Sequence, residues 1–142
     1  METFTTLGKF FGDTFSELDC DVKTRAYIVS IFAKYTSSTY DLSDDSITLT
    51  FFRARQNQDF LTYQTLGDWI FFAKVEFPEH LRHASEDYYT TVAQMSYYSC
   101  YRLINRQWKL FEELADRLDE LENEARYLLT QSNVPIPLLS RR

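Results

Sequence analysis

Two histidines and two carboxylates recur at helical spacing in the middle of the chain. Glu76, His80, His83 and Asp87 follow one another at intervals of four, three and four residues. On an unbroken helix these side chains share one face, and imidazole–carboxylate sets bind zinc, iron or manganese. Pro78 separates Glu76 from the others, which leaves His80, His83 and Asp87 as the candidate metal ligands. We favour the other interpretation, a polar turn between two helices that requires no cofactor, because a Ser85 cap would break the set.

Cysteine chemistry is not indicated by the sequence. Cys20 and Cys100 lie far apart and form no C-x-x-C pair, which fits a reducing cytosol, although a disulfide between them remains an alternative. A nucleophilic cysteine needs a basic setting that lowers its pKa. Cys100 lies among tyrosines in a predicted helix, so we expect it to be a small buried apolar residue. We therefore expect no catalytic residue and a protein that is not an enzyme.

Charged residues after position 100 form a basic stretch and then an acidic one. Arg102, Arg106 and Lys109 recur at helical spacing beside aromatic residues, a pattern found in single-strand nucleic-acid binding. The acids that follow are Glu112, Glu113, Asp116, Asp119, Glu120, Glu122 and Glu124, here called the acidic ridge. The chain has 21 acidic and 15 basic residues, a net charge of −6, which disfavours nucleic acid and anionic membranes. A basic protein surface is the better partner.

Aromatic residues make up 17% of the chain, more than we expect one small core to hold. Surplus apolar surface indicates a protein partner or self-association, and we infer no small-molecule substrate. Our candidate partner-binding residues are Trp69, Trp108, Glu112, Glu113, Asp116 and Glu120. The apolar segment Val134–Leu139, which contains Ile136 and Leu138, is a second candidate for docking.

Composition excludes several protein classes. Three glycines cannot form a GxGxxG turn or a phosphate-binding loop, and three prolines with few turn residues disfavour a β-sandwich or barrel. The longest apolar run, Trp69–Ala73, has five residues, against the roughly 20 that span a membrane. The first residues lack the apolar core of a signal peptide. We therefore expect a cytoplasmic protein.

Helical periodicity predicts an all-α protein with six or seven helices in one bundle-like domain, residues 1–133. Residues 134–142, with Pro135 and Pro137, are expected to form an extended tail. In the ambiguous segment Ser43–Gln58, apolar residues alternate as in a strand. We predict a helix there because Ser43 and Asp44 suit a helix start and no second strand is evident to pair with it.

Particular residues should position these helices. Asp19 or Asp21 should cap the second helix and Ser85 a later one, whereas Pro78 should end a helix at Phe77. Gly67 lies inside that helix and indicates a close helix–helix approach. We expect a break near Asn105 and then one continuous last helix. Two rows of apolar residues in this helix repeat every seven positions: Phe111, Leu118 and Ala125 form one row, and Leu114, Leu121 and Leu128 form the other.

The segment Leu66–Leu121 also resembles a group of small bacterial all-helical proteins. The resemblance rests on Leu66-Gly67-Asp68-Trp69, Phe77-Pro78-Glu79, Tyr88-Tyr89 and Leu110-Phe111-Glu112-Glu113-Leu114. It implies a helical, cytoplasmic, bacterial protein, in which Gly67 and Pro78 serve packing and chain reversal. It implies no activity and no site residues.

We expect the chain to be a non-catalytic protein-interaction module, either an accessory or adaptor subunit of a bacterial complex or a small homo-oligomer. Two alternatives stay open. One is a metal-binding protein or metalloenzyme that uses His80, His83 and a carboxylate. The other is an acidic inhibitor of phage type that occupies a nucleic-acid-binding surface, which the charge alone suggests.

Overall fold

The computed structural model describes residues 2–38, 44–81 and 84–132, and every regular element in these ranges is a helix. The α-helices are α1 (Glu2–Thr14), α2 (Val22–Thr36), α3 (Asp44–Asn57), α4 (Phe60–Glu76), α5 (Glu86–Leu103), α6 (Lys109–Asp116) and α7 (Leu118–Gln131), and a short 3₁₀ turn spans Pro78–His80. The predicted all-α class is confirmed. The ambiguous segment is helical over Asp44–Asn57. Residues 134–142, with Ile136 and Leu138, lie outside the described ranges.

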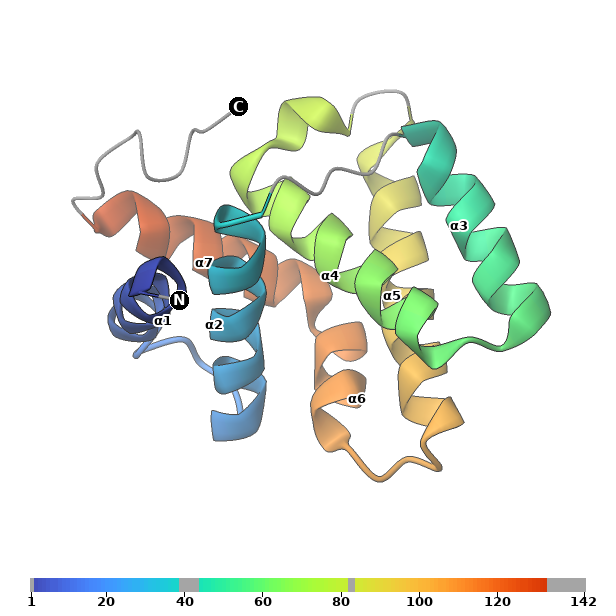
Figure 1. Cartoon of the computed structure of the whole chain (residues 1–142), viewed down its shortest axis with the longest axis horizontal. Helices are drawn as coiled ribbons and strands as arrows, with labels where there is room; N and C mark the ends of the chain where they lie inside the picture. The colour runs from blue at the N-terminus through green and yellow to red at the C-terminus, as the bar shows by residue number, and fades with distance from the viewer. Residues whose placement is uncertain (1, 39–43, 82–83, 133–142) are drawn as a thin grey trace.

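Helix α4 lies at the centre of the fold (Figure 1). It packs most extensively against α5 and also contacts α2, α3 and α7, while α1 packs on α2. Every residue from 66 to 75 on α4 is buried, because this helix is apolar around its whole circumference. All these helices share one connected hydrophobic core. Among the described residues, no helix combines the length and the apolar character needed to cross a membrane.

The ends of the helices follow local rules that the sequence predicts. Asp21 caps α2, where its side chain accepts a hydrogen bond from the Lys23 amide, and the Ser85 hydroxyl accepts one from the Tyr88 amide in α5. Helix α4 ends at Glu76, with Phe77 as its C-cap before Pro78. Helix α5 ends at Leu103, and Asn105 lies in the following turn with a positive φ of 57°. The predicted break near Asn105 is therefore confirmed.

The prediction of one continuous last helix is wrong. The chain turns between α6 and α7, where Arg117 adopts φ −116° and ψ 27° (Figure 1). The heptad residues Phe111, Leu114, Leu118, Leu121 and Ala125 are all buried on both sides of this turn. The turn lets α6 pack on α5 and α2 while α7 packs on α4, so two short helices bury apolar faces in different directions.

Helices α4 and α5 approach closely at Gly67. A Cβ atom placed on Gly67 would lie 3.0 Å from the ring of Tyr97. That ring is fully buried, and its hydroxyl donates a hydrogen bond of 2.7 Å to Asp68. The ring therefore has little freedom to move away.

Replacing Gly67 by alanine should destabilise the protein by about 1–3 kcal/mol, because the added methyl group overlaps the Tyr97 ring. Gly12→Ala in α1 is the matched control, since a Cβ there meets nothing within 4 Å. It should stabilise the protein by about 0.5–1 kcal/mol through helix propensity. Urea denaturation of both variants measures the change in the free energy of unfolding, which should be a decrease for Gly67→Ala and an increase for Gly12→Ala. A stabilising Gly67→Ala would show that the helices can separate at this point.

Candidate functional site

A groove of about 980 Å³ lies between the start of α2 and α6. It is lined by Asp21, Val22, Lys23, Thr24, Ala26, Gln107, Trp108, Lys109, Leu110, Glu112, Glu113, Asp116 and Arg117. Two segments that are more than 80 residues apart in the sequence form its two sides. The groove brings together Trp108, Glu112, Glu113 and Asp116, four of the residues that the sequence singles out for partner binding.

Two large apolar side chains of the groove are open to solvent. Val22 is 67% exposed and Trp108 is 54% exposed. The Trp108 indole stacks on the buried ring of Phe111, with centroids 6.2 Å apart and an interplanar angle of 16°. Phe111 in turn contacts aromatic rings of α2, α4 and α5, namely Tyr27, Phe60 and Tyr97. The exposed indole therefore packs on a ring that its aromatic neighbours hold in place.

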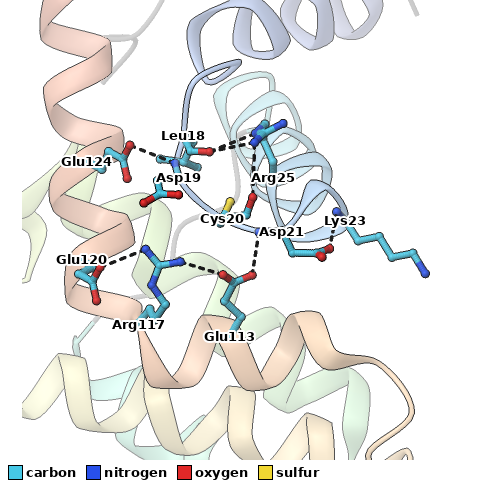
Figure 2. Close-up of polar contacts among 10 residues, drawn as sticks. All are labelled: Leu18, Asp19, Cys20, Asp21, Lys23, Arg25, Glu113, Arg117, Glu120 and Glu124. Carbon is cyan, nitrogen blue, oxygen red and sulfur yellow. Dashed lines mark hydrogen bonds and ion pairs between the residues drawn. The ribbon is translucent and has the colours of Figure 1, made fainter.

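A network of charged side chains holds the two sides of the groove together (Figure 2). The Glu113 carboxylate of α6 accepts a hydrogen bond from the Asp21 amide at the start of α2, with an N–O distance of 3.2 Å. Arg117 pairs with Glu113 at 2.8 Å and with Glu120 at 3.0 Å. One more contact joins the loop before α2 to α7, from the Asp19 amide to the Glu124 carboxylate. Glu113 and Arg117 are thus occupied within the protein.

The loop between α1 and α2 contains Cys20 beside this network. Arg25 donates hydrogen bonds to the backbone oxygens of Leu18 and Cys20 and so fixes the loop. Burial and the neighbouring Glu113 carboxylate raise the pKa of the Cys20 thiol to about 11. Burial also raises the pKa of Cys100, which is fully enclosed. Both thiols are free and stay protonated at neutral pH, which makes them poor nucleophiles.

In the core, the buried carboxyl group of Asp68 joins three helices. It accepts hydrogen bonds from the hydroxyls of Tyr27 on α2, at 2.8 and 2.9 Å, and of Tyr97 on α5, at 2.7 Å. Gln64 donates a further hydrogen bond to the Tyr27 hydroxyl. Burial raises the pKa of Asp68 to about 7, although both tyrosines act in the opposite direction. This cluster fixes the two tyrosines that support Phe111.

A second buried polar cluster joins α4 to α7. The Lys74 ammonium forms a 2.8 Å ion pair with Glu122, and both side chains are nearly inaccessible. Lys74 also donates a hydrogen bond to Thr90, and Arg126 donates one to the Lys74 carbonyl. Desolvation outweighs the attraction of Lys74 and raises the pKa of Glu122 to about 7. We assign this cluster a structural role because it joins α4 to α7 through an ion pair that is closed off from solvent.

The other predicted site residues do not join the groove. Trp69 is fully buried in the core, so it does not contribute to a contact surface. Glu120 is exposed on α7 and reaches the groove only through Arg117. His80 stacks on Phe77, with ring centroids 5.4 Å apart, and His83 lies outside the described ranges. Within those ranges no three His, Cys, Asp or Glu residues are placed to hold a metal ion, so the metal site with Asp87 stays a prediction.

Some important residues had a sequence signal that we did not use. Asp68 and Lys74 are isolated charges inside the apolar stretch 66–75, and such charges in a buried helix must have partners. Val22 had no comparable signal. Its exposure depends on how α2 meets α6, which the periodicity of neither helix reveals.

Stability should decrease as the pH rises from about 4 to about 7. In this range the unfolded chain has released the Asp68 proton while the folded protein retains it, so this group alone should lower the free energy of unfolding by about 1 kcal/mol per pH unit. The pKa values of Glu76 and Glu122 are raised to about 7 as well and act in the same direction. Thermal denaturation across this range should show that the free energy of unfolding falls less steeply with pH in Asp68→Asn than in the wild type. The control Asp116→Asn, at an exposed position, should keep the wild-type slope, and equal slopes in all three proteins would contradict the prediction.

Replacing Lys74 by methionine should destabilise the protein by about 3 kcal/mol, because Glu122 then stays buried without its partner. The double variant Lys74→Met/Glu122→Leu should recover most of this loss. Lys9→Met serves as the control, since the Lys9–Asp13 pair is exposed to solvent and should matter by less than about 0.5 kcal/mol. Denaturant titration measures the free energy of unfolding of the two single variants and of the double variant. A double variant as unstable as Lys74→Met would show that the ion pair itself is essential.

No protein-family model, no curated protein and no solved structure matches this chain. The resemblance over Leu66–Leu121 therefore stays an expectation.

Proposed function

We propose that this protein is a non-catalytic protein-binding module, and that its groove between α2 and α6 holds a segment of a partner protein. The observation that carries the proposal is the exposed Trp108 and Val22 in one groove of about 980 Å³. Tryptophan is enriched among the residues that dominate binding energy at protein interfaces. An accessory or adaptor role follows from binding without chemistry.

The construction of the groove supports this proposal. Trp108 stacks on Phe111, which is fully buried, so the indole is ordered before a partner arrives. Glu113 likewise joins α6 to the start of α2 by accepting a hydrogen bond from the Asp21 amide, and Arg117 holds the Glu113 carboxylate in place. A preorganised surface loses little conformational entropy on binding, which favours affinity.

Site-specific photocrosslinking in the cells that produce the protein tests the proposal. A benzophenone amino acid at Val22 should give discrete adducts with a partner protein, and these should diminish when Trp108→Ala is added. The same probe at Phe52, which is 61% exposed on α3 and outside the groove, is the matched control.

The partner identified in this way should then bind Trp108→Ala at least about tenfold more weakly than wild type, as expected for an interface hot spot. Isothermal titration calorimetry with purified proteins measures this, and Phe52→Ala should bind like wild type. Circular dichroism checks that both variants are folded. Equal adducts at both probe positions, or an affinity that Trp108→Ala leaves unchanged, would rule the groove out as the binding site.

A further inference from the structure

The charged residues around the groove differ in whether the protein itself satisfies them. Asp21, Glu113 and Arg117 are bound to one another or to backbone amides. Asp116 is exposed on α6 and has no polar partner among the described residues. Glu112 has a single distant partner, the exposed Lys109 ammonium at 3.8 Å. Two carboxylates of the groove are therefore available to a ligand.

The basic residues of the groove neutralise its acids only in part, because its lining has three bases, Lys23, Lys109 and Arg117, against four acids, Asp21, Glu112, Glu113 and Asp116. Lys109 donates a hydrogen bond to the Tyr101 hydroxyl on α5. The Lys23 side chain points away from Glu113 and Arg117 (Figure 2). Next to the groove, α7 adds the exposed carboxylates of Asp119 and Glu120. The end of the groove near α7 therefore has a negative potential that attracts cations.

The remaining features of the groove require a partner with apolar groups. Val22 and Trp108 present apolar surface beside the free carboxylates. A small cation would leave this apolar surface exposed to water, whereas a peptide with an apolar side chain could cover it.

We propose that the groove binds a basic apolar segment of another protein, with an aliphatic or aromatic side chain against Val22 and Trp108 and a lysine or arginine facing Asp116 and Glu112. This inference rests on the proposed function and adds the chemistry of the partner. Charge complementarity of this kind raises the association rate and selects the partner.

Selection of random dodecapeptides displayed on phage tests the proposal with defined probes. The purified protein is the target, and peptides that also bind Trp108→Ala are removed. The peptides that remain should carry an excess of lysine and arginine beside at least one large apolar residue. Their binding should change the fluorescence of Trp108 and should weaken several-fold when sodium chloride rises from about 0.05 M to about 0.3 M.

A pair of charge variants isolates the role of the two carboxylates. Glu112→Gln/Asp116→Asn should weaken the selected peptides by about tenfold, since each exposed ion pair contributes a few-fold. Glu86→Gln/Asp87→Asn removes the same charge from two exposed acids at the start of α5 and should leave affinity unchanged. Peptides that depend on Trp108 but are neutral or acidic, or that both double variants bind equally, would overturn the basic partner and leave the proposed function standing.

Two further outcomes also decide against this inference. A selection that returns no peptide dependent on Trp108 would overturn a linear segment as the ligand, while photocrosslinking at Val22 would still decide the proposed function. A synthetic peptide of residues 133–142 has apolar residues and two arginines of its own. If it binds more tightly than every selected peptide, the groove belongs to this chain's own segment and not to another protein.

Discussion

The hydrogen bonds that Asp68 accepts from Tyr27 and Tyr97 hold the centre of this fold together. They join α2, α4 and α5 at a point where burial would otherwise make a carboxylate costly. Because two hydroxyls donate to one carboxyl group, the relative positions of the three helices are specified more sharply than apolar contacts alone would specify them. Gly67 belongs to the same arrangement, since it allows the Tyr97 ring to lie against α4.

The groove depends on this arrangement through Phe111. The rings of Tyr27 and Tyr97 contact Phe111, and Phe111 supports Trp108. A shift of α2 relative to α5 would therefore reach the exposed indole through two layers of aromatic packing, which transmit strain because protein interiors are close-packed. The position of Trp108 in the groove therefore depends on the hydrogen-bonded cluster of Asp68, Tyr27 and Tyr97.

The bend at Arg117 has an equally direct consequence for the acidic ridge. On one straight helix, the residues from Glu112 to Glu124 would extend in one direction. The bend divides them: Glu113 and Asp116 line the groove, Glu124 holds the loop before α2, and Glu122 is buried against Lys74. One stretch of acids thereby occupies three different settings, namely the lining of the groove, an anchor for a loop and a buried ion pair.

Local sequence was enough to predict the all-α class, the Ser85 cap, the stop at Pro78, the close approach at Gly67 and the break near Asn105, because each depends on a few adjacent residues or on one helical period. For the cap of α2 it left Asp19 and Asp21 open, and the structure has Asp21. The sequence also pointed to Trp108 and the acids of α6. Three other features could not be predicted in this way: Trp69 is buried while Trp108 is exposed, the last heptads bend at Arg117, and Val22 lies in one groove with α6. These features depend on contacts between distant segments, and helical periodicity specifies which face of a helix is buried but not which helix covers it.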